Sequence, residues 1–298
     1  ELRAASHKRR GKQPASTLLC RLQTDPPTTQ FKTAACLYLM GQGGPIKPSA
    51  DAAGIGKETL RRWMTHFTDA VNQDLKPIYM PAKPWSESEL AQVRGNFASR
   101  RGIPNVALAC DGSHIPFHPI CPRKEAVDYR NYKGWNYILA VAFVDSYYRF
   151  FDLDVGAPGK AGDNTVLKYN WLMEEIGKAP DRWLGKHGVV LGDSGASDKD
   201  RFFLNPYHAP TTPTRCWFNF CHSSTRFYVE ETFGRWKNKW RFLMNPVRAK
   251  HKLATNMIYA SAILHNFCLA HHPNHTEADA TYFHTSANTA WDSFLVSH

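Results

Sequence analysis

Two features are missing from this 298-residue chain: a long apolar run and a regular set of cysteines. No stretch approaches the roughly 18 uninterrupted apolar residues of a membrane helix, and the basic segment 1–16 lacks the apolar core of a secretory signal. The seven cysteines are odd in number and include no CxxC pair, which favours reduced thiols inside the cell over a disulfide framework. Cys216, Cys221 and His222 lack a fourth ligand at a familiar spacing, so we do not expect zinc there.

Acidic residues are also scarce. The chain has 26 Asp and Glu against 37 Lys and Arg, which gives a net charge of +11 and a pI of about 9.3. The excess is clustered: residues 1–22 carry six basic side chains against one acid, and residues 226–252 carry eight against two. Clustered positive charge of this size predicts binding to nucleic acid. The N-terminal HKRRGK is interpreted as a nuclear signal, a DNA-contacting arm or a solubilising end.

The first 77 residues are predicted to form a small all-α DNA-binding unit. An apolar helix (31–40) is followed by a short helix, a turn at Gly54 and a second helix (57–71) that carries Arg61 and Arg62. This order is typical of a helix-turn-helix, whose second helix enters the DNA major groove. The alternative is a helical hairpin that only packs on the next domain.

Residues 78–85 are predicted to be a linker, because three nearby prolines break any helix. Residues 86–298 are then expected to form an α/β domain, whose first helix starts at Ser86 with Glu89 completing a capping box. A further helix is expected to be capped by Asp163. The predicted strands are 105–111, 136–145, 148–156 and 187–193, and two long helices are expected near 223–243 and 253–269.

Asp111 and Asp193 each end one of these predicted apolar strands. A carboxylate in that place is costly unless it is solvated in a cleft or neutralised. If the two strands are parallel neighbours, about 4.8 Å apart, the carboxylates converge where α/β sheets bind ligands. Their repulsion would raise one pKa, and a divalent cation such as Mg²⁺ would relieve it.

Glu230 supplies a third acid, on the first long C-terminal helix. Val229, Phe233, Trp236 and Trp240 recur at helical spacing and predict a buried stripe. Glu230 lies on the flank of that stripe, on a face continued by Gly234, Lys237 and Arg241, which suits a metal ligand beside a phosphate track. Alternatively, Glu230 pairs with an arginine one helical turn away. Glu231 points further round the helix and is the weaker candidate.

Six sequence blocks carry a resemblance to a known family. In order they are ACDGSHIP (109–116), YRNYKGWNY (129–137), VGAPGKAGD (155–163), LGDSG (191–195), FNFCHSSTRFYVEETFGRWKNKWR (218–241) and ILHNFC (263–268). Together they resemble the PIF/Harbinger superfamily of DDE transposases over about residues 105–270. Two positions depart from the family pattern: Ser113 replaces the usual Thr, and Gly162-Asp163 replaces a His-Asp pair. GDSG also resembles the nucleophile block of trypsin-like proteases, a reading disfavoured by the preceding buried strand.

The resemblance implies an RNase H-like catalytic domain in which Asp111, Asp193 and Glu230 form the metal-binding triad. It implies cleavage of DNA and joining of 3′-hydroxyl ends with two Mg²⁺ ions, for which Mn²⁺ would substitute, held about 3.5–4 Å apart. It further implies transposon ends and target DNA as substrates, a nuclear location, and a Myb-like DNA-binding protein or a second copy of the chain as partners. The alternative is a domesticated nuclear DNA-binding protein that keeps the fold without transposition.

The remaining candidate residues have supporting roles. We expect Asp163 to act as a helix cap or an outer acid of the site, and His114 and His222 to contact DNA or support the triad. His265 and Asn266 fall in an apolar helix and are interpreted as satisfied core groups. The predicted DNA-contacting residues are Arg61, Arg62, Lys133, Arg226, Lys237, Arg241 and Lys250.

Overall fold

The computed structural model describes residues 27–120, 127–130, 134–158, 162–193 and 201–271. Its N-terminal part is helical, as predicted: α2 (Thr29–Gln42), α3 (Ile46–Ala52) and α4 (Lys57–Ala70). Gly54, at a φ of +65°, makes the turn between α3 and α4, and a left-handed residue of this kind costs least as glycine. The buried side chains of these helices belong to the same continuous hydrophobic cluster as the sheet.

The predicted linker is partly helical. After a π-helical turn (Val71–Leu75), the short helix α5 (Lys76–Tyr79) includes Pro77 in its first turn, where a missing N–H is tolerated. Residues 80–86 have no regular structure. The capping box is confirmed: α6 (Glu87–Arg101) begins with the Ser86 N–H donating to the Glu89 carboxylate at 2.9 Å, and the Glu89 N–H donating back to the Ser86 hydroxyl.

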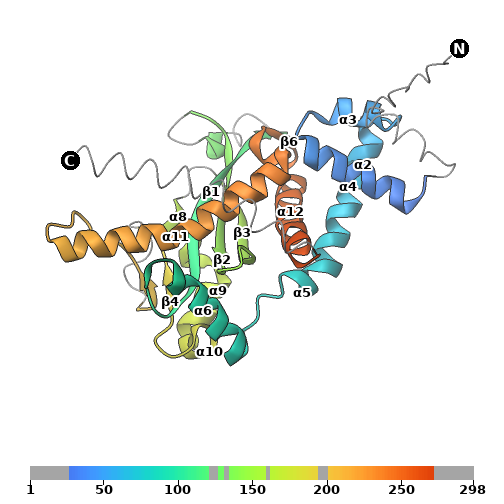
Figure 1. The fold of residues 1–298 in the computed structure, drawn as a ribbon. Helices are drawn as coiled ribbons and strands as arrows, with labels where there is room; N and C mark the ends of the chain where they lie inside the picture. The colour runs from blue at the N-terminus through green and yellow to red at the C-terminus, as the bar shows by residue number, and fades with distance from the viewer. Residues whose placement is uncertain (1–26, 121–126, 131–133, 159–161, 194–200, 272–298) are drawn as a thin grey trace, which may run out of the picture.

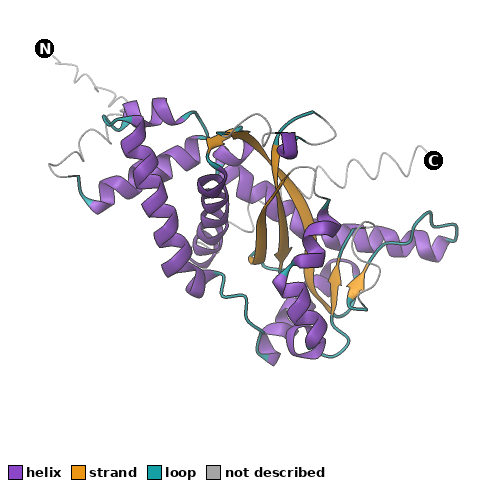
Figure 2. Cartoon of the chain, turned by 180° about the vertical axis from the view of Figure 1, so that it is seen from behind, coloured by secondary structure: helices purple, strands orange, loops and turns teal. Residues whose placement is uncertain are grey.

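A mixed sheet forms the centre of the molecule (Figure 2). Its strand order is β3-β2-β1-β4-β5, with β6 pairing to the far end of β1. The first three strands are antiparallel, whereas β4 and β6 run parallel to β1, and β5 parallel to β4. This mixed α/β arrangement is consistent with the RNase H-like fold. The strands are β1 (Val106–Pro119), β2 (Tyr137–Val144), β3 (Phe150–Pro158), β4 (Val189–Leu191), β5 (Phe203–Leu204) and β6 (Val247–Ala249).

The first strand is longer than the sequence indicated. It was expected to end at Asp111, but β1 continues to Pro119 because its second half pairs residue by residue with β2, from Gly112 opposite Val141 to Pro116 opposite Tyr137. Asp111 therefore lies within a strand rather than at its end. The short strands β5 and β6 fall in segments without a periodic apolar pattern.

The helix expected after residue 162 is divided. It forms α8 (Asp163–Tyr169) and α9 (Trp171–Lys178), because the Asn170 side-chain oxygen accepts the N–H groups of Leu172 and Met173 and starts a new helix. The N-cap position of α8 is Gly162, so Asp163 is the first helical residue and not the predicted cap. A short helix, α10 (Pro180–Leu184), leads to β4.

Two long helices complete the fold (Figure 1). The first, α11 (Pro213–Lys239), begins ten residues earlier than expected and lies across the sheet, with its N-terminal part projecting beyond it. A 3-10 turn, η3 (Arg241–Met244), precedes β6. The second, α12 (His251–His271), lies between β3 and the N-terminal helices. Helix α12 is long and apolar enough for a membrane span, but 56% of that window is buried, as in a core helix.

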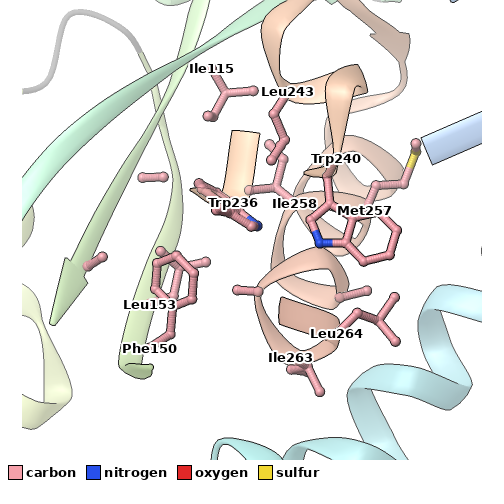
Figure 3. Close-up of a cluster of buried hydrophobic side chains, with 14 of the residues drawn as sticks. Ile115, Phe150, Leu153, Trp236, Trp240, Leu243, Met257, Ile258, Ile263 and Leu264 are labelled. Carbon is pink, nitrogen blue, oxygen red and sulfur yellow. The ribbon is translucent and has the colours of Figure 1, made fainter. Parts of the chain in front are cut away.

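The predicted stripe on α11 is buried against α12 and β3 (Figure 3). Val229, Phe233, Trp236 and Trp240 are each less than a tenth exposed. The Trp236 indole N–H, inside this cluster, donates to the Ser261 hydroxyl at 2.9 Å. This packing fixes the rotation of α11 about its own axis, and with it the direction in which Glu230 emerges.

Candidate active site

Asp111 and Asp193 converge because β1 and β4 are parallel neighbours, which is the condition that the sequence analysis set for their convergence. Ala109 pairs with Leu191, so the two aspartates stand at equivalent positions, each two residues further along its chain. Both residues are half-buried. Their charges interact: the negative charge of Asp193 is one of the effects that raise the pKa of Asp111.

One guanidinium group joins the third acid to the first. Arg226 and Glu230 lie four residues apart on α11, and Arg226 Nη2 donates to Glu230 Oε1 at 2.6 Å. Its other nitrogen, Nη1, donates to Asp111 Oδ2, also at 2.6 Å. The Arg226 side chain is 16% exposed and that of Asp111 19%, so this junction is largely shielded from water. The structure thus contains the helical pair that the sequence left as an alternative for Glu230, and extends it to Asp111.

Burial and charge oppose each other at this junction. Burial raises the pKa of Asp111, whereas the Arg226 charge and hydrogen bond and the Gly112 N–H, 3.0 Å from Asp111 Oδ1, lower it; the net pKa is raised. Burial lowers the pKa of Arg226, but the charges of Asp111, Glu230 and Asp193 outweigh that effect and raise it. Arg226 therefore stays charged and serves as the counter-ion of all three acids.

The donor chemistry of this site fits a hard divalent cation. All three candidate ligands are carboxylates, and oxygen ligands of this kind suit Mg²⁺ and Mn²⁺. Within the described ranges, no group of three or more His, Cys, Asp or Glu side chains is close enough to hold a metal ion. The Arg226 guanidinium bridges Asp111 and Glu230. The three acids are therefore gathered around one positive charge, but not in a geometry that already forms a metal site.

The other histidine and acid candidates have different surroundings. The His222 ring is buried, and its Nε2–H donates to the Leu204 carbonyl at 2.7 Å, which ties β5 to α11; burial lowers its pKa. His114 is exposed on β1, with its ring 5.5 Å from that of Tyr137. Glu231 is buried beside Arg235, at 2.7 Å. Lys133 lies outside the described residues, and for Asp163 only the backbone is described.

The basic residues predicted to contact DNA differ in their surroundings. Lys237 contacts β1: its ammonium donates to the His114 carbonyl at 3.3 Å, and burial lowers its pKa. Arg61 is paired with Glu58, and it lines a cavity of about 450 Å³ between α4 and β6 together with Arg248. Three more are exposed, namely Arg62, Arg241 and Lys250.

The core polar groups were predicted correctly. The His265 Nε2–H donates to the Tyr148 carbonyl at 2.9 Å, and burial lowers the pKa of His265 to about 4. The Asn266 amide donates to the Tyr79 and Phe150 carbonyls, both at 2.8 Å, and accepts the Phe150 N–H at 2.9 Å. Both residues hold α12 against the start of β3 and have no contact with the three acids.

Comparison with known proteins identifies this region. Residues 110–266, more than half of the chain, match the family described as "DDE superfamily endonuclease". Two relatives are "Protein ALP1-like" of Arabidopsis thaliana, 23% identical over 258 residues, and "Putative nuclease HARBI1" of Xenopus laevis, 21% identical over 248. Each alignment covers 82% of this chain, but only 62% and 68% of the respective relative. No solved structure matches. The family indicated by the six sequence blocks is thereby confirmed.

Proposed function

Because the chain belongs to the DDE superfamily endonuclease family, we propose that it is a metal-dependent nuclease that cuts DNA phosphodiester bonds and joins the resulting 3′-hydroxyl to a second strand. The observation that carries the proposal is the gathering of Asp111, Asp193 and Glu230 around the single guanidinium of Arg226. Acids brought together from two strands and a helix, with a buried positive charge between them, are costly for a purely structural role.

Asp111, Asp193 and Glu230 would hold the metal, which is Mg²⁺ in this proposal with Mn²⁺ as a substitute. Bound divalent ions would lower the pKa of an attacking water and balance the charge on the departing oxygen. The chain supplies the placement: Asp111 and Asp193 emerge from paired strands, and the buried stripe of α11 aims Glu230 at them. These rigid elements confine the carboxylates to one region, although Arg226 has to leave Asp111 and Glu230 before they can hold a metal ion.

Arg226 has two successive roles in this proposal. Without metal it prevents Asp111 and Glu230 from repelling each other, through the two 2.6 Å hydrogen bonds. With a metal held by the carboxylates, the Arg226 guanidinium would be free to present its paired N–H groups to a phosphate of the substrate. Lys237, which already faces the edge of β1, would contact the same strand.

DNA would be held by basic side chains outside the acidic centre. Arg241 and Lys250 are exposed and follow α11 in the chain, and they would contact phosphates of the DNA backbone. Helices α3 and α4 would read DNA as a helix-turn-helix, with exposed Arg62 contacting it more directly than the paired Arg61. A nuclear location, a Myb-like accessory protein and pairing of two copies belong to the same proposal.

A DNA-binding protein without strand cleavage is the second candidate. It is favoured by the position of Arg226, because a guanidinium that keeps Asp111 and Glu230 occupied also keeps them from binding a cation. Cleavage with added metal distinguishes the two candidates.

The test is cleavage of end-sequence DNA with Mg²⁺ by the unsubstituted chain and by Asp193→Asn. We expect Asp193→Asn to lose at least about a hundredfold in rate, and Asp181→Asn, which alters an exposed aspartate in α10, to retain full activity. Undiminished cleavage by Asp193→Asn would refute the assignment of the acids. Metal-independent DNA binding without cleavage by the unsubstituted chain would support the second candidate.

A further inference from the structure

The N-terminal part of α11 projects beyond the sheet (Figures 1 and 2). Together with the loop before it, this part carries aromatic and arginine side chains that contact one another. We call it the aromatic arm and define it as Tyr207, Arg215, Trp217, Phe218 and Phe220. It has two faces: Arg215, Tyr207 and Phe218 lie on one, and Trp217 and Phe220 lie on the other, because residues 215 and 217 are about 200° apart around the helix. Trp217 is 64% exposed and Tyr207 48%. Large aromatic groups exposed together on a protruding element usually mark a binding surface.

The aromatic arm is internally ordered. Asn219 fastens the loop to the helix, since its side chain accepts the Tyr207 N–H at 2.8 Å and donates to the Tyr207 carbonyl at 2.9 Å. The Tyr207 and Phe218 rings meet edge to face at 5.2 Å. The Trp217 and Phe220 rings stack at 5.3 Å with an interplanar angle of 28°. These exposed rings are therefore held in place before any ligand binds.

The charges of the aromatic arm indicate what it binds. The Arg215 guanidinium lies 5.0 Å over the Tyr207 ring, and that of Arg101 lies 5.6 Å over Phe220. Residues 201–229 contain no Asp or Glu. A second copy of this surface would bring arginines against arginines, which is unfavourable. Aromatic rings combined with arginines and no acids are the chemistry that binds nucleic-acid strands, through stacking and phosphate contacts.

The aromatic arm is aligned with the candidate active site. Arg215 precedes Arg226 by eleven residues on one helix, so the two arginines lie on the same face, about 16 Å apart along the axis. At 3.4 Å per base pair this is roughly five base pairs of DNA. A strand whose cleavage point lies at the acids would therefore reach Arg215 if it followed α11.

We propose that the aromatic arm is a second DNA-binding site, which holds the strand about five nucleotides from the bond to be cut. Arg215 contacts a phosphate, and Tyr207, whose ring lies under the Arg215 guanidinium, stacks against an unpaired base. The inference rests on the proposed function, because it takes DNA to be the substrate, but it requires no cleavage.

Binding measured in the absence of metal tests this site separately from catalysis. The full chain in EDTA is titrated into fluorescein-labelled DNA, either a blunt 30-base-pair duplex or the same duplex with a ten-nucleotide single-stranded tail, and anisotropy is followed across salt concentration. The variants are Arg215→Ala and Tyr207→Ala. Arg182→Ala, at an exposed arginine on α10, is the matched control, and thermal melts verify folding.

We expect Arg215→Ala to weaken binding to both DNAs and to lower the slope of log affinity against log salt by about one. Tyr207→Ala should weaken binding to the tailed duplex at least about fivefold, and more than to the blunt duplex. Unchanged affinities in both variants would overturn the inference. A dimer that Tyr207→Ala converts to a monomer, with DNA affinity unchanged, would overturn it in favour of contact between copies. If the unsubstituted chain binds no DNA, the proposed function itself fails.

Discussion

Replacing Arg226 should strengthen the binding of divalent metal. In the unsubstituted chain, a cation has to displace the guanidinium from Asp111 and Glu230, to which it donates at 2.6 Å. Arg226→Met keeps most of the side-chain volume and removes the competing charge. The acids would then repel one another without a counter-ion, and a cation would relieve that repulsion directly.

The size of the effect follows from the exposure of the two bonds. The Arg226–Asp111 hydrogen bond joins side chains that are 16% and 19% exposed. Its contribution is therefore taken as that of a charge-assisted hydrogen bond, about 1.5–3 kcal/mol. The Glu230 side chain is 42% exposed, and solvent reduces its bond to less than about 1 kcal/mol. A net effect of about 2 kcal/mol corresponds to roughly a 30-fold lower Kd for Mg²⁺ or Mn²⁺.

Titration calorimetry with MnCl₂ and MgCl₂ at pH 8 measures this directly; a high pH is chosen because burial raises the pKa of Asp111. The matched control is Arg235→Met, which removes an arginine of the same helix from its bond to Glu231 at 2.7 Å and should leave metal affinity unchanged. Equal or weaker metal binding by Arg226→Met than by the unsubstituted chain would show that Arg226 does not compete with the cation.

Three further predictions concern stability. His222→Phe leaves the Leu204 carbonyl of β5 without its donor, so urea unfolding should show a free energy of unfolding lower by about 1–3 kcal/mol, with unchanged metal affinity. A loss of metal binding at full stability would instead make His222 part of the site. Gly43→Ala should lower stability by at least about 2 kcal/mol, because φ at Gly43 is +68° and a Cβ there would lie 2.5 Å from a backbone carbon of η3. The control is Gly41→Ala, whose added Cβ meets nothing within 4 Å and should not lower stability. Equal melting temperatures of the two variants would count against the packing of α2 on η3. Burial lowers the pKa of His265 to about 4 in the folded chain, against an ordinary 6.5. Between these pH values the unfolded state binds more protons, so the free energy of unfolding should fall by about 3 kcal/mol as the pH drops from 6.5 to 4. The same pH dependence in a His265→Gln chain would contradict this.

Local patterns in the sequence were sufficient to predict most helices and strands and the elements that carry the three acids. The apolar stripe Val229 to Trp240 identified the buried face of α11, and so the flank on which Glu230 lies. The apolar runs before Asp111 and Asp193 identified two strands that indeed pair in parallel. These patterns are reliable because a helix or strand with one buried face needs apolar residues at a fixed spacing, and that spacing can be read from neighbouring residues.

Features that depend on distant partners could not be predicted in this way. Strand β1 continues past Asp111 because β2 pairs with it, and no nearby residue signals that. Asn170 divides a helix through its own side-chain oxygen, although the flanking apolar pattern continues across it. The Arg226–Asp111 bond joins residues 115 positions apart; the i,i+4 spacing indicated only the Glu230 half of that junction.

A structure of the chain with bound Mn²⁺, located by its anomalous scattering, tests the central claim most directly. The account predicts manganese bound by oxygens of Asp111, Asp193 and Glu230, with the Arg226 guanidinium turned away from all three. Manganese found only elsewhere, with Arg226 still bridging Asp111 and Glu230 at saturating metal, would contradict it.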